Sequence, residues 1–192
     1  MKKVFGNDKH LGCFDHTLNL TPKAALGYKK VQNENIPNVE GIPELIDKVK
    51  KIVGFSHRSY NFANELKRIQ MEMGKSEGTA LRLCQDVITR WGSTYLMLER
   101  FLDLREVVTL AALKFPEVDV LTASQFATLR VIRDILKPFH QATTEMSAEK
   151  TTTASKVIPI ITLVRKVCFN LAHACKGSSI YSIIILFSWR II

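Results

Sequence analysis

The stretch that decides the fold covers residues 89–100 and reads TRWGSTYLMLER. An arginine and a tryptophan come first, followed by the small polar residues Ser93 and Thr94, which are typical of helix N-caps. Apolar residues then recur at helical spacing as far as Ala111, and Phe115-Pro116 follows. The pattern predicts an amphipathic helix that begins near Ser93 or Thr94 and ends before the proline.

Helical spacing of apolar residues recurs on both sides of this stretch. The segments that show it are 13–28, which Pro22 interrupts; 42–53, with Pro43 in the first turn; 60–73; a helix opened by Thr122 that Pro138 bends or breaks; and 154–174. A bend is expected at 56–61, and loops or irregular segments at 29–41, 74–78, 81–89 and 147–153. No strand-like alternation and no internal repeat appears in the sequence, which therefore predicts an all-α protein.

The chain is basic, with a net charge of +9 over 192 residues. The two parts of the sequence share this charge almost evenly: residues 1–75 carry +5 and the rest +4. A polyanion is a candidate partner for such a chain. The densest basic run is Lys48-Val49-Lys50-Lys51, and a solvated helix face is the simpler interpretation of that run.

The cysteines and the start of the chain indicate a reducing compartment. Four cysteines do not form a disulfide framework at this length, and Met1-Lys2-Lys3 does not lead into the apolar stretch of a signal peptide.

Residues 176–192 form an atypical apolar tail that is too short for a transmembrane helix, so no membrane association is expected. We expect this tail to be non-native, arising from a frameshift, a read-through intron or a truncated gene model.

Cys13 and His16 have the spacing of two metal ligands on one helix face. Zinc needs three or four protein ligands, and the other cluster, which consists of Cys168, His173 and Cys175, lies about 150 residues away. From composition alone, Cys13 packs as a small apolar residue and His16 makes local hydrogen bonds. The sequence therefore predicts no metal site and no cofactor.

Arg90 and Trp91 allow two interpretations. A tryptophan ahead of an amphipathic helix is commonly a core anchor. Alternatively, Arg90 binds a DNA phosphate and Trp91 stacks on an unpaired base, which is worth about 1–3 kcal/mol per base. The spacing of the two residues is compatible with both interpretations.

Four blocks in order carry a family resemblance: 13–20 (CFDHTLNL), 89–100, 135–147 (ILKPFHQATTEMS) and 158–161 (IPII). This order resembles hAT-type DNA transposases and their BED-zinc-finger relatives, over about residues 10 to 170. The resemblance implies an RNase H-like remnant at 1–12, a helical insertion-type domain at 13–175, and the tail at 176–192.

The resemblance also implies roles for four residues. In that family the histidine of the Cys-x-x-His block lies near the scissile phosphate, which places His16 there with Cys13 in support. The Arg-Trp pair of the family contacts DNA and stabilises a flipped base, which gives that role to Arg90 and Trp91. Gly92 departs from the pattern, since asparagine is common at this position in the family.

Catalysis is not expected from this chain. The family cuts DNA with three carboxylates that hold two divalent metal ions. Two of the aspartates lie ahead of the Cys-x-x-His block and the glutamate follows the insertion domain, whereas only 12 residues precede Cys13 here. Asp15, Asp86 and Glu99 are expected to be solvated or capping charges. The BED zinc finger is also absent from the sequence.

The resulting expectation is a nuclear, non-catalytic, hAT transposase-like protein that binds DNA weakly through Cys13, His16, Arg90, Trp91 and scattered lysines. A helical protein-interaction module is the first alternative, in which Trp91 is a core residue and exposed apolar faces dock a partner or a second copy. A degenerate copy of a transposable element without a selected function is the second alternative.

Overall fold

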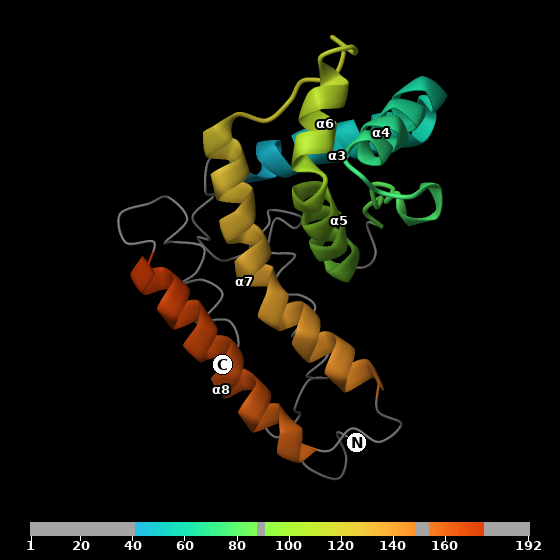
Figure 1. Ribbon diagram of the computed structural model, residues 1–192. Coiled ribbons are helices and arrows are strands. Elements are labelled where there is room, and N and C mark those ends of the chain that lie inside the picture. The colour runs from blue at the N-terminus through green and yellow to red at the C-terminus, as the bar shows by residue number, and fades with distance from the viewer. Residues whose placement is uncertain (1–40, 88–90, 149–153, 175–192) are drawn as a thin grey trace, which may run out of the picture. The chain divides into compact units, whose positions relative to one another are not determined.

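The computed structural model describes residues 41–87, 91–148 and 154–174, and this part of the chain is helical without a strand (Figure 1). The expected all-α fold is therefore confirmed for these residues. The elements are α3 (Ile42–Arg58), α4 (Tyr60–Glu72), the 3₁₀ turn η2 (Glu77–Thr79), α5 (Trp91–Asp103), α6 (Arg105–Ala112), α7 (Ala123–Ala148) and α8 (Ala154–Ala174). The expected helix at 13–28 and the segments 1–12 and 176–192 lie outside the described residues.

The chain divides into two compact units. One is residues 40–134, here called the central unit, and the other is formed by residues 1–39 together with 135–192, here called the terminal unit. The boundary falls within α7.

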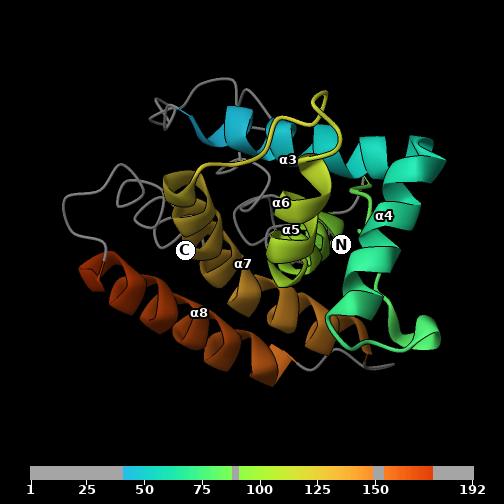
Figure 2. The same ribbon diagram turned by 45° about the horizontal axis from the view of Figure 1, so that its top comes forward.

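Ser59 separates α3 from α4, as the expected bend at 56–61 indicated. Its backbone is extended, with φ −99° and ψ 107°, and its hydroxyl accepts a hydrogen bond from the backbone N–H of Phe62 at 3.3 Å. A serine in this position is an N-cap, which satisfies a donor that the first turn of a helix leaves unpaired. Figure 2 shows α4 leaving the end of α3 at a steep angle.

An aromatic cluster holds α4 against the end of α6. The ring centroids of Phe55 and Phe115 each lie 5.2 Å from that of Phe62, which is fully buried. Tilted and edge-to-face pairs at this distance stabilise by about 0.5–1.5 kcal/mol beyond the area they bury. A Lys114–Glu65 ion pair of 2.8 Å joins the same two elements at the surface.

The helix expected from residue 93 or 94 to Ala111 is two helices that begin earlier. α5 starts at Trp91, so the prediction of a start at Ser93 or Thr94 was two or three residues late. Leu104, with φ −99° and ψ 14°, interrupts the regular backbone between α5 and α6. Leu104 is 1% exposed, so its packing in the core accompanies the break. The apolar spacing continues across this residue, which is why the sequence pattern did not reveal the break.

α7 begins with a capping box. The Thr122 hydroxyl accepts a hydrogen bond from the backbone N–H of Gln125, and the Gln125 side chain accepts one from the backbone N–H of Thr122. Phe126, in the first turn, stacks on Phe101 of α5 with centroids 6.1 Å apart. The helix continues through Pro138 to Ala148, so the proline does not break it.

The terminal unit is described from Ile135 onward. Its buried apolar residues come from the second half of α7 and from α8, and they are Ile135, Leu136, Phe139, Ala142, Ile160 and Val164. The bounds of α8 are those expected from the sequence. Within the described residues, no helix combines the length and apolar character that membrane crossing requires.

Candidate nucleic-acid interface

The four residues expected to contact DNA are only partly covered by the structure. Cys13, His16 and Arg90 lie outside the described residues, and Trp91 is described only as the first residue of α5. The structure does describe the segment that leads to Arg90 and Trp91. This segment, residues 80–87, has no regular secondary structure and is here called the lead-in segment.

Gln70 of α4 fixes the beginning of the lead-in segment. Its side-chain amide donates to the carbonyl of Leu81 at 2.9 Å and accepts from the backbone N–H of Leu81 at 2.8 Å. The same amide nitrogen also donates to the carbonyl of Leu66. Gln70 is 1% exposed, so these bonds form away from water. The amide pairs with Leu81 much as a neighbouring β-strand would.

Two further side chains bind the next carbonyls. His57 Nε2, at the end of α3, lies 3.0 Å from the Leu83 carbonyl oxygen and donates to it in the tautomer that carries the proton there. Arg100 of α5 donates to the Arg82 carbonyl at 3.2 Å. Three helices therefore hold the backbone of three consecutive residues in a segment that forms no helix or strand of its own.

Asp86 ties the end of the lead-in segment to the first turn of α5. Its carboxylate accepts hydrogen bonds from the hydroxyls of Ser93 at 2.8 Å and Thr94 at 2.9 Å. On the other side it forms an ion pair with Lys50 of α3, at 3.0 Å. The backbone N–H of Val87 donates to the Ser93 hydroxyl at 2.8 Å, which closes the arrangement.

The Asp86 side chain is only 6% exposed, so the expectation of a solvated charge was wrong for this residue. The capping alternative is closer, since the carboxylate bonds side chains at the amino-terminal end of α5. Burial raises the pKa of Asp86, but the hydrogen bonds from Lys50, Ser93 and Thr94 outweigh burial and hold the pKa below its usual value. Asp86 therefore stays ionised at neutral pH and keeps Lys50 paired.

Two other charge expectations can be compared with the structure. Glu99 is partly buried and accepts a hydrogen bond from the Tyr95 hydroxyl at 2.5 Å. In the basic run of α3, Lys48 pairs with Asp119 at 2.8 Å and Lys50 with Asp86, while Lys51 is exposed. The run is thus largely engaged within the protein.

The net charge is distributed unevenly between the two units. The central unit holds 14 lysines and arginines against 13 aspartates and glutamates, so almost all of the net +9 belongs to the terminal unit. Generic attraction of the central unit for a polyanion is therefore small. Binding of DNA there has to come from particular side chains in a particular arrangement.

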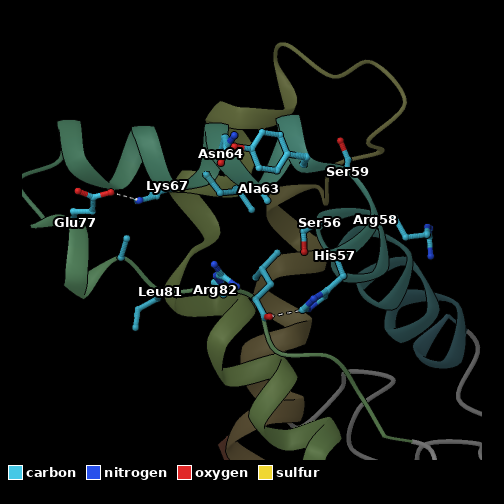
Figure 3. A pocket seen from close by; sticks show the side chains of 14 residues that line it. Ser56, His57, Arg58, Ser59, Ala63, Asn64, Lys67, Glu77, Leu81 and Arg82 are labelled. Carbon is cyan, nitrogen blue, oxygen red and sulfur yellow. Dashed lines mark hydrogen bonds and ion pairs between the residues drawn. The ribbon is translucent and has the colours of Figure 1, made fainter.

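A cavity of about 440 Å³ lies beside the lead-in segment, at the α3–α4 junction. Figure 3 shows the side chains that line it, which come from the end of α3, the start of α4 and residues 77–83. The labelled cations are Arg58, Lys67 and Arg82, and His57 is labelled beside them. The labelled carboxylate is Glu77, which pairs with Lys67 at 2.5 Å. Sequence patterns gave no signal for this cavity, because it forms only where residues 77–83 pack beside the α3–α4 junction.

Within the described ranges, no group of three or more His, Cys, Asp or Glu side chains is placed to hold a metal ion. The cysteines and histidines considered for zinc, at 13–16 and 168–175, lie outside the residues whose side chains are described.

Comparison with known proteins identifies the family. The model of the ZBED1 RNase-like helical domain matches residues 11–133, which is more than half of the chain. The chain belongs to this family. The resemblance to BED-type, hAT-derived proteins is thereby confirmed. The match ends at residue 133, one residue before the end of the central unit.

Two curated relatives agree with this assignment. The human protein "Zinc finger BED domain-containing protein 4" is 26% identical over 161 residues, which are 84% of this chain and 13% of that protein. The "Putative transcriptional regulator tpeD" of Talaromyces stipitatus is 26% identical over 166 residues, which are 79% of this chain and 19% of that protein. The chain thus spans less than a fifth of the length of either relative.

Proposed function

We propose that this protein associates with DNA at the start of α5, through Arg90 and Trp91, with Cys13, His16 and scattered lysines in support. The observation that carries the proposal is the fixation of the lead-in segment. Side chains from α3, α4 and α5 bind it from Leu81 to Asp86, and the Asp86 carboxylate bonds two hydroxyls of the first turn of α5. Such support is what a site needs in order to hold its contact residues before the ligand arrives.

The family supports the same proposal. One relative is named for a zinc-finger BED domain and the other as a transcriptional regulator. We propose a nuclear role in gene regulation for this chain as well, as part of DNA association. We also propose that the chain does not cut DNA, in line with the expectation from its sequence.

The test uses hairpin DNA with a single-stranded flank and the full chain. Trp91→Ala should weaken binding by about 5- to 150-fold, because loss of one stacked base costs about 1–3 kcal/mol. Equal affinity of wild type and Trp91→Ala, or no binding at low salt, removes the proposal. Nicking of the same DNA by the wild-type chain in Mg²⁺ or Mn²⁺ contradicts the non-catalytic part.

A protein-interaction module remains the second candidate, and α8 favours it. Ile158 and Leu163 of this helix are 73% and 59% exposed, and the helix contains three cations and no carboxylate. Docking of a second copy of the chain on this helix would remove these apolar side chains from water. Leu163→Glu should then shift the protein toward a smaller species in light scattering after size exclusion; an unchanged mass argues against the module.

A further inference from the structure

The cavity at the α3–α4 junction has the chemistry of a nucleotide site. Its volume of about 440 Å³ lies within the range of small-ligand pockets. Its lining contains three permanent cations and one carboxylate, in a central unit whose charges otherwise balance. A second cavity, of about 500 Å³, has Glu44, Glu117 and Asp119 beside its cations and is less suited to a phosphate.

Arg82 is the cation best placed to bind an anion. It is exposed, and no carboxylate in the described part of the chain pairs with it. The backbone around it is fixed, because Gln70 holds Leu81, Arg100 holds the Arg82 carbonyl and His57 holds Leu83. A guanidinium on a fixed backbone loses less freedom when it forks onto a phosphate.

The other two cations of the cavity have different surroundings. Lys67 pairs with Glu77, and a phosphate in the cavity competes with that carboxylate for the ammonium group. Arg58 folds back over α3, where its Nη1 lies 3.1 Å from the place that a Cβ on Gly54 would occupy. The carboxylate of Glu77 therefore disfavours an anion in this cavity. Removing its charge, as in Glu77→Gln, should strengthen the binding of an anion.

Tyr60 and Asn64 supply groups that suit a base. Tyr60 is the first residue of α4 and is 78% exposed, so its ring is free to stack. Asn64 is also exposed and lines the same cavity, one helical turn further on. Residues four apart share a helix face, so a stacking ring and an amide that both donates and accepts hydrogen bonds lie together.

We propose that this cavity binds one unpaired nucleotide of a nucleic-acid strand. Tyr60 stacks on the base, Asn64 bonds its edge, and Arg82 and Lys67 bind the phosphate. The inference rests on the proposed function and extends it along the lead-in segment, which lines the cavity at one end and meets α5 at the other. It adds a preference for single-stranded flanks, since a paired base cannot stack on Tyr60.

The experiment measures fluorescence anisotropy of a labelled hairpin with a single-stranded flank, and of the same hairpin without a flank. In both, a non-nucleotide linker closes the hairpin, so that only the flank offers unpaired bases. The full chain carries Tyr60→Ala, Tyr60→Phe, Arg82→Gln or Glu77→Gln. The matched control is Arg105→Gln, because Arg105 is a partly exposed arginine on α6 that pairs with Glu106 and does not line the cavity. Circular dichroism of each variant confirms that it folds.

On the flanked hairpin, Tyr60→Ala should lose about 5- to 150-fold in affinity and Tyr60→Phe little, because stacking needs only the ring. Arg82→Gln should lose affinity and Glu77→Gln should gain it, while Arg105→Gln leaves it unchanged. The unflanked hairpin should respond to none of the cavity variants. A nucleoside monophosphate that competes far better than inorganic phosphate indicates that the base is recognised as well as the anion.

The outcomes separate this inference from the proposed function. If Trp91→Ala lowers the affinity for the flanked hairpin while Tyr60→Ala and Arg82→Gln do not, the cavity site is overturned and the start of α5 is left as the interface. Loss with the cavity variants and none with Trp91→Ala overturns the role of Trp91 and retains the cavity. Equal binding of the flanked and unflanked hairpins by the wild type contradicts the nucleotide site.

Discussion

Asp86→Asn removes the buried charge at the end of the lead-in segment while keeping the size of the side chain. Both hydroxyls bond Oδ1 of Asp86 and the ammonium group of Lys50 pairs with Oδ2, so in the asparagine variant Oδ1 still accepts from the hydroxyls while an NH₂ group replaces the oxygen that faces Lys50. A hydrogen bond to a charged group is worth about 1.5–3 kcal/mol, and breaking a fully buried ion pair costs about 3–5 kcal/mol. Lys50 is 24% exposed and can regain water, so we expect a loss of about 2–3 kcal/mol in the free energy of unfolding.

The assay is urea unfolding followed by far-UV circular dichroism, with Asp119→Asn as the matched control. Asp119 also pairs with a lysine of α3, but its side chain is 83% exposed, so its loss should cost about 0.2–1 kcal/mol. In thermal unfolding, Asp86→Asn should lower Tm by about 4–12 °C for a chain of this length. Equal costs for the two substitutions would refute the reasoning that burial makes the Asp86 contacts strong.

The pH dependence of the stability difference between wild type and Asp86→Asn provides a second check. The pKa of Asp86 is lowered in the folded state, so the folded protein binds fewer protons than the unfolded chain at acidic pH. The carboxylate therefore stabilises the fold above its unfolded pKa of about 3.9, and this contribution is lost as the pH falls through the folded pKa. The gap between wild type and Asp86→Asn should narrow below about pH 4.

Three further substitutions test the elements around the interface. Arginine and lysine partners lower the pKa of Glu65 to about 2, so wild-type stability should fall as the pH drops from 4.5 toward 2, and Glu65→Gln should flatten that slope in acid titrations. Gln70→Leu leaves the backbone N–H and C=O of Leu81 without their hydrogen bonds and should lower the free energy of unfolding by about 2–4 kcal/mol. The Leu81 amide should also exchange its hydrogen faster, whereas Gln85→Leu, at an exposed position, should change stability little. Thr122→Ala removes the cap of α7 and should cost about 0.5–2 kcal/mol in urea unfolding.

The helices of this fold could be predicted from the sequence because their apolar spacing reflects what is buried. α8 and the start of α3 were predicted at their observed bounds, and the Ser59 bend falls within the expected range. The break at Leu104 could not be predicted, because apolar periodicity describes a face and not the backbone angles of one residue. α5 begins two or three residues before the expected start, which is less than one helical turn. Sequence signals locate the ends of helices least precisely.

The support of the interface could not be predicted, because it consists of polar contacts between residues far apart in sequence. Asp86 lies 36 positions from Lys50, and His57 lies 26 from Leu83. Such pairs produce no periodic pattern in the sequence. In the sequence alone, a carboxylate in an irregular segment cannot be distinguished from an ordinary surface charge. Arg90 and Trp91 were singled out by their rarity and by the family resemblance, and their contacts with DNA stay a prediction.

We propose that the arrangement of side chains in the central unit holds DNA, and one measurement tests this most directly. Hairpin DNA with 5-bromouracil in its single-stranded flank is cross-linked to the full chain by ultraviolet light, and the linked peptides are mapped. We predict cross-links at Tyr60 and within residues 80–91. Cross-links confined to residues 135–174, where five cations face two carboxylates, would indicate generic attraction to charge and contradict the account.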